Sequence, residues 1–98
     1  VAQATGNNDV LGQITFKGHN SSDTVTESGM VRFTQVGSAT ANVSSKLEVS
    51  VGTSTGSQVG LTLNEERVLS VSRQASAPSA VAGGFYADTS VNVYFGIS

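Results

Sequence analysis

Apolar and polar residues alternate with a period of two along most of the chain. This is the pattern of β-strands that turn one face toward a core and the other toward solvent. No stretch carries an apolar stripe with the helical period over three turns. The chain is therefore predicted to be all-β. The clearest alternating runs cover residues 10–17, 31–34, 46–51, 59–63, 69–72 and 91–95.

Turn-forming residues separate these runs, and Asn64–Arg67 is interpreted as a hairpin loop between two of them. Six or seven short strands spaced in this way predict an antiparallel sandwich or barrel. Residues 10–98 form a single domain in this interpretation. A flexible arm over residues 1–9 precedes it, and a mobile loop over residues 74–82 interrupts it.

Composition narrows the function classes. The 98 residues suffice for one small domain. A net charge of −2, with five scattered Lys and Arg residues, excludes a broadly basic nucleic-acid surface. The absence of Cys excludes disulfides and thiol nucleophiles. No apolar run approaches the roughly 18–20 residues of a membrane span. The start at Val1 is expected either from removal of a signal peptide or from excision of a fragment, and the Ser-, Thr- and Gly-rich composition favours an exported mature protein.

Candidate catalytic and metal-binding residues are few. His19 is the single histidine, and Ser21 and Asp23 complete the residue types of a catalytic triad. All three fall in one turn, whereas triad members converge from separate elements, so a solvated turn histidine is favoured. Residues 7–9 (Asn-Asn-Asp) are too short for a calcium loop. The sequence therefore predicts a protein that is not an enzyme and has no metal or cofactor.

Phe85 and Tyr86 are adjacent aromatic residues that could stack on a sugar ligand. The alternative, in which one ring is buried and the other lies at a strand edge, is favoured but leaves the ligand-binding interpretation open.

Two segments at opposite ends of the chain resemble a known family. Residues 12–18 (Gly-Gln-Ile-Thr-Phe-Lys-Gly) are similar to the G-x-[VI]-x-F-x-G pattern near the mature N-terminus of chaperone–usher fimbrial (pilin) subunits. Residues 83–95, where Gly-Gly-Phe-Tyr precedes an alternating strand, resemble the last strand of those pilins and of spore-coat-U-type subunits. The matching segments make up about a fifth of this short, cysteine-free chain.

The resemblance implies an immunoglobulin-like antiparallel sandwich of about six or seven strands, which a donor strand from a neighbouring subunit can complete. Residues 10–18 would be the donor strand. Its apolar side chains would enter pockets, and its glycines would permit close backbone approach. The implied donor residues are Val10, Gly12, Ile14, Phe16 and Gly18.

The resemblance also implies partners. The strand carrying Val91, Val93 and Phe95 would form one wall of the acceptor groove and the contact for a periplasmic chaperone. Other pilin subunits, an outer-membrane usher and a host-surface receptor complete the expected partners, while no nucleic acid or membrane span is expected. The implied function is a structural subunit of a surface fimbria, exported through the periplasm and contributing to adhesion.

Two alternatives stay open. Residues 10–18 can equally form an ordinary first strand within their own chain, because the periodicity fits both arrangements. The protein can also be a self-contained β-sandwich, either an adhesin that binds a ligand or glycan, or a phage or viral surface protein.

Overall fold

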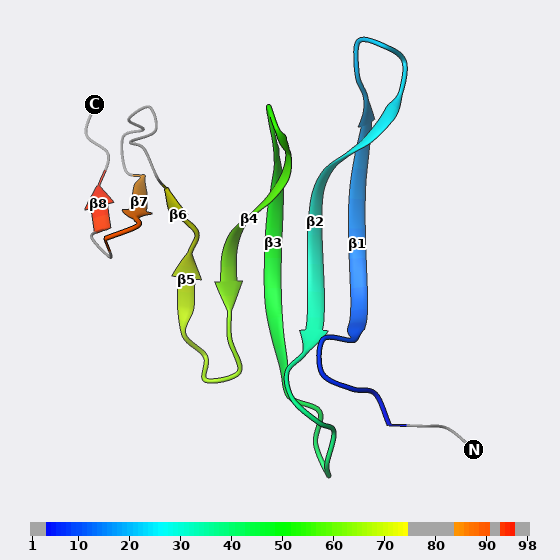
Figure 1. The fold of residues 1–98 in the computed structure, drawn as a ribbon, viewed down its shortest axis with the longest axis vertical. Coiled ribbons are helices and arrows are strands. Elements are labelled where there is room, and N and C mark those ends of the chain that lie inside the picture. Colours follow the sequence, from blue (N-terminus) through cyan, green and yellow to red (C-terminus); the bar gives the residue numbers. More distant parts are fainter. Residues whose placement is uncertain (1–3, 75–83, 91–92, 96–98) are drawn as a thin grey trace.

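A computed structural model of the chain describes residues 4–74, 84–90 and 93–95. The regular structure in these residues is β-strand, arranged in two sheets (Figure 1). The five-stranded sheet contains β1 (Val10–His19), β2 (Val25–Gln35), β3 (Ser45–Thr53), β4 (Gly56–Leu63) and β5 (Leu69–Val71). The three-stranded sheet contains β6 (Arg73–Gln74), β7 (Phe85–Asp88) and β8 (Val93–Phe95).

Each strand of the five-stranded sheet pairs antiparallel with the next one along the chain, in the order β1-β2-β3-β4-β5. In the small sheet β6 pairs parallel with β7, and β7 pairs antiparallel with β8. The predicted all-β class is confirmed, and the division into two sheets is consistent with an immunoglobulin-like β-sandwich. The antiparallel meander requires only short connections, which fits the closely spaced turn signals in the sequence.

The five-stranded sheet is an extended layer. Viewed down the shortest axis of the molecule, the small sheet lies beside β5 and does not overlie β1–β4 (Figure 1). The radius of gyration is 16.6 Å, whereas a compact domain of this length has about 13 Å. The extents of 55 × 39 × 20 Å agree with a broad, thin shape.

One face of the five-stranded sheet, here called the apolar face, carries rows of apolar side chains that cross the strands. The first row is Ile14, Val31, Val49, Leu61 and Val71, which are cross-strand neighbours on β1 to β5. The second row is Phe33, Leu47, Leu63 and Leu69. In a third row, Phe16 and Val51 lie on either side of Gly29. Directly opposite residues in a ladder share a face, so these rows form one continuous surface.

Three of the four buried side chains in the described part of the sheet do not lie on its apolar face. Among the described residues, Met30 is the one buried apolar side chain, at 6% exposure, and it lies on the opposite, polar face. Thr34 and Ser50 are buried on that same face. On the apolar face Ile14 and Leu69 remain 60% and 61% exposed. No apolar side chain of this face is therefore fully buried by the described part of the chain: Val31, Leu47, Val49, Leu61 and Val71 are half-buried and the others are exposed.

The register of β1 corrects one prediction. The alternation placed Val10 on the same face as Gly12 and Ile14, but a β-bulge lies between Val10 and Gly12. Val10 is opposite Thr34, whereas Gly12 is opposite Phe33. The extra residue shifts the side-chain parity, so Val10 lies on the polar face and the predicted face was wrong.

Two strands differ from their sequence-based bounds. β2 begins at Val25, although the alternation predicted a strand only from residue 31. A register shift between Phe16 and Lys17 leaves Ser28 without an opposite partner on β1, and this hides the period-two pattern in the first half of β2. The described part of residues 83–95 contains two strands and not one. β7 ends at Asp88 and pairs antiparallel with β8.

The expected Asn64–Arg67 hairpin loop is present between β4 and β5. Except for Gln74, which lies in β6, the predicted mobile loop over residues 74–82 falls outside the described residues.

Residues 5–9, within the predicted flexible arm, hydrogen-bond to the end of β2. The Asn8 amide donates to the Gln35 carbonyl and the Gln35 amide donates to the Asp9 carbonyl, both at 2.9 Å. The Gln35 Nε2 group donates to the Thr5 carbonyl at 3.0 Å. Gln35 is completely buried as a result, at 0% exposure.

Candidate functional site

The segment expected to act as a donor strand is β1, which forms one edge of the five-stranded sheet (Figure 1). It pairs with β2 of its own chain along one side. Ile14 and Phe16 project from the apolar face and are more than half exposed. A Cβ atom added at Gly12 or Gly18 would meet no atom within 4 Å, so these glycines make no close backbone contact within the described chain.

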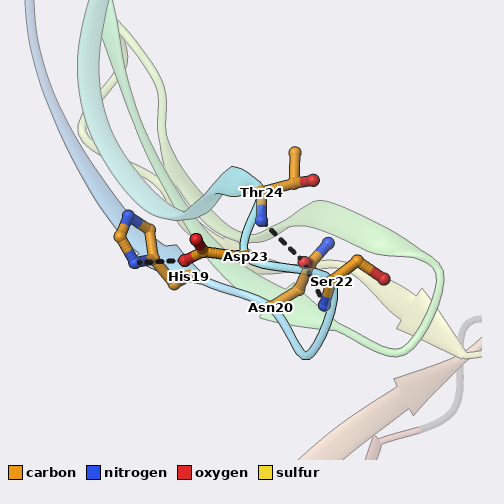
Figure 2. A network of polar contacts seen from close by, with 5 residues as sticks. All are labelled: His19, Asn20, Ser22, Asp23 and Thr24. Carbon is orange, nitrogen blue, oxygen red and sulfur yellow. Dashed lines mark hydrogen bonds and ion pairs between the residues drawn. The ribbon is translucent and has the colours of Figure 1, made fainter.

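A five-residue turn, Asn20–Thr24, joins β1 to β2 (Figure 2). The Asn20 side-chain oxygen accepts hydrogen bonds from the Ser22 amide at 2.9 Å and from the Thr24 amide at 3.0 Å. The Asn20 amide also donates to the Thr24 carbonyl, and the Asp23 amide donates to the Asn20 carbonyl. Asp23 adopts a left-handed backbone conformation with φ of 58°. The turn is thus held mainly by one asparagine, as in other Asx turns.

The exposed side chains of His19 and Asp23 approach each other at this turn. The His19 Nδ1 atom lies 3.4 Å from an oxygen of Asp23 (Figure 2). Within the described chain no hydrogen bond joins Ser21 to either residue. This arrangement lacks both the hydrogen-bonded nucleophile and the shielding from water that triad chemistry requires. The sequence interpretation of His19 as a solvated turn histidine agrees with the geometry.

A shallow groove of about 320 Å³ lies where β5 meets the small sheet. Its walls are mostly apolar and include Phe85, one of the two aromatic residues suggested for ligand binding. Tyr86, the next residue, is not part of the lining, because consecutive strand side chains point to opposite sides. The lining residues are Leu69, Ser70, Val71, Arg73, Phe85, Ala87 and Val93.

Of the three residues predicted to form the acceptor strand, the structure describes Val93 and Phe95. Val93 is exposed and lines the groove beside β5. Phe95 is paired through its backbone with Phe85 in the β7–β8 ladder. Val91 lies outside the described residues. β8 therefore borders the groove through Val93 and is separated from β1 by the rest of the five-stranded sheet (Figure 1).

A second hollow, of about 360 Å³, lies at the other end of the β4–β5 pair. Its lining includes Phe33, Leu47 and Leu63 of the apolar face, and the charged residues Glu65 and Arg67 of the β4–β5 loop. Leu63 lies opposite Leu69, which lines the first groove, so both hollows open from one apolar surface. No motif in the sequence marks the residues of this hollow as functional. Their alternation was the available signal, but it was interpreted as core.

The polar face holds a charge pair between neighbouring strands. The Arg32 Nη2 group lies 3.2 Å from the Glu48 carboxylate, which also accepts a hydrogen bond from the Thr34 hydroxyl at 3.3 Å. Both members of the ion pair are partly buried between β2 and β3. The Arg32 Nε atom is buried without a hydrogen-bond partner. The side chains of this cluster link β2 to β3.

In the described ranges, no group of three or more His, Cys, Asp or Glu side chains is placed to hold a metal ion. Asp9, from the Asn-Asn-Asp segment, instead accepts a hydrogen bond from the Gly6 amide at 2.7 Å. The same ranges contain no helix with the length and hydrophobicity needed to cross a bilayer.

Comparison with known proteins gives no match. No protein-family model matches the chain, and neither the curated proteins nor the solved structures contain a match to it. The features of the chain that bear on its function are the exposed edge of β1, the apolar face and the two hollows that open from it.

Proposed function

We propose that the protein is a non-enzymatic structural subunit of a fimbria-like surface assembly, in which copies are joined by donor-strand exchange of β1. The observation that carries the proposal is the position of this strand. β1 is an edge strand, it pairs with β2 alone, and Ile14 and Phe16 project from it onto the apolar face. The resemblance of residues 12–18 to pilin donor segments supports the same assignment.

Exchange is energetically accessible because it preserves the contacts that the strand makes. If β1 of one copy lies beside β2 of the next, the same ladder and the same cross-strand pairs form between chains. Only the Asn20–Thr24 turn must open. Its hydrogen bonds contribute about 0.5–1.5 kcal/mol each, so a concentrated assembly can offset their loss.

Strand exchange of this kind gives an open polymer. Each copy donates one β1 and accepts one, and the contact is head-to-tail, so the chain of subunits does not close unless its rotation happens to do so. We further propose that the subunits are exported through the periplasm. There a chaperone would cover the exposed β-sheet surface until the subunits polymerise. Loops at the surface of the fibre would bind a host-surface receptor.

A reversible covalent lock tests the exchange in the full chain. Lys17 and Glu27 lie directly opposite each other on β1 and β2 and are both exposed. Because the chain has no native Cys, the double variant Lys17→Cys/Glu27→Cys can form a single internal disulfide. We expect the oxidised variant to remain unpolymerised and the reduced variant to give the wild-type ladder on unboiled gels.

The matched control places the disulfide between strands that do not exchange. Thr62 and Ser70 are opposite each other on β4 and β5, and Thr62→Cys/Ser70→Cys should polymerise equally well whether oxidised or reduced. Polymer formation by the oxidised Lys17→Cys/Glu27→Cys protein would refute exchange of β1. A wild-type protein that forms no polymer at high concentration would refute it as well.

One observation favours a second function, that of a ligand-binding adhesin. The groove beside β5 is close in size to small-molecule sites, which begin at about 300 Å³, and it combines an apolar wall with Arg73 at its margin. Phe85→Ala should then abolish ligand or glycan binding while Tyr86→Phe preserves it. Equal binding by the wild type and by Phe85→Ala would exclude this groove as the site.

A further inference from the structure

We propose that the apolar face of the five-stranded sheet is an interface that packs against the same face of a second copy of this chain. This inference goes beyond strand exchange, because exchange uses the edge of β1 whereas the apolar face spans all five strands. Protein domains are built from at least two packed layers. Within the described residues the apolar side of this sheet has no second layer over β1–β4 (Figure 1).

The distribution of charge makes the face compatible with its own copy. The charged residues in the strands of the five-stranded sheet all lie on the polar face by their ladder register. They are Lys17, Glu27, Arg32, Lys46 and Glu48. Two copies with a net charge of −2 each can therefore meet through the apolar face without bringing like charges together. The charged residues that border this face are Glu65, Arg67 and Arg73, which line its two hollows and lie outside the strands of the five-stranded sheet.

The size of the face fits a specific but modest dimer. Five strands about 4.8 Å apart, over five residues about 3.3 Å apart, give a plan area of about 400 Å² per copy, and side-chain relief increases the accessible area. Specific interfaces begin at about 1,000 Å² in total. The face is at the lower end of that range, so we expect a micromolar dissociation constant.

The pairing geometry follows from sheet packing. Two such sheets would stack about 10 Å apart with their side chains interdigitated. A two-fold axis places the same residues on both sides, and Val49 on the central strand β3 would lie near it. Phe33 and Leu63, which are exposed in the single chain, would then become buried.

Exposed residues on opposite faces give a matched test by sedimentation velocity over a concentration series. Leu69 lies on the apolar face and Gln13 on the polar face, and both are exposed. We expect a wild-type dimer, a dissociation constant raised at least tenfold by Leu69→Lys, and a change below about twofold for Gln13→Lys. Phe33→Lys is a second face variant, and far-UV circular dichroism verifies that each variant is folded.

The outcomes separate this interface from strand exchange. The oxidised Lys17→Cys/Glu27→Cys protein keeps β1 in its own sheet, so it should still dimerise and should lose the dimer on addition of Leu69→Lys. A wild-type protein that stays monomeric up to about 0.1 mM, well above the expected micromolar range, would overturn the proposal and indicate that another part of the chain covers the face. Equal effects of folded Leu69→Lys and Gln13→Lys, or a monomeric locked protein, would overturn it too.

Discussion

Gly52 of β3 lies against the backbone of Ser28 in β2. A methyl group at Gly52 would lie 2.8 Å from the Ser28 carbonyl oxygen and 3.2 Å from its Cα atom. Because backbone cannot move aside as a side chain can, we expect Gly52→Ala to destabilise the protein by about 1–3 kcal/mol. Gly12→Ala, at a position with no atom within 4 Å, is the control and should change stability by less than about 0.5 kcal/mol.

Urea unfolding of the two glycine variants, followed by circular dichroism, measures the difference. Similar midpoints for Gly52→Ala and the wild type would show that β2 and β3 separate more easily at the Ser28 bulge than the structure indicates.

Asn64 holds the loop between β4 and β5 in the same way that Asn20 holds the loop between β1 and β2. Its side-chain oxygen accepts hydrogen bonds from the Glu66 amide at 3.0 Å and from the Val68 amide at 2.9 Å. We expect Asn64→Ala to cost about 1–2 kcal/mol, because both amides lose their acceptor within the chain. Asn64→Asp keeps an acceptor oxygen and should retain most of the stability in thermal unfolding. A loss as large as that of Asn64→Ala would contradict this role for the oxygen.

Arg67 adopts a left-handed backbone conformation, with φ of 66°. A side chain in this region is strained, whereas glycine adopts it readily. Arg67→Gly should therefore stabilise the protein by about 0.5–1 kcal/mol, even though glycine usually destabilises. Glu66→Gly, one residue earlier and not in the left-handed region, is the control and should lower the melting temperature. A lower melting temperature for Arg67→Gly would mean that the loop relaxes around Arg67 without strain.

Gln35 links the N-terminal residues to the end of β2. Its Nε2 group donates to the carbonyls of Thr5 and Gly37, at 3.0 and 2.9 Å. Gln35→Ala removes these bonds and leaves both acceptors without them, so we expect a loss of about 1–3 kcal/mol. The Asn8 amide should also exchange with solvent faster, which hydrogen–deuterium exchange detects. Gln13→Ala, at an exposed strand position, should leave this amide as protected as in the wild type.

The local pattern of the sequence was sufficient to predict much of the sheet. The alternating runs gave the positions of β3, β4 and β5 to within a few residues, and the Asn64 loop was predicted from its turn-forming composition. These features depend on period-two alternation and on side-chain hydrogen bonds to nearby backbone. Both are determined by residues that are close together in the sequence. The residues of a ligand site were harder to predict from the sequence. Phe85 and Tyr86 are adjacent aromatic residues, but only Phe85 of the two lines the groove.

The sequence by itself determined that this chain forms strands with one apolar and one polar side. Tertiary structure decided which residues share a side, because β-bulges at Leu11 and Ser28 shift the parity of the ladder by one residue. It also decided that β1 lies at an edge and that the apolar face stays uncovered over β1–β4 by the described residues. Alternation specifies that a face is apolar, whereas burial depends on which distant segment or neighbouring molecule packs against it.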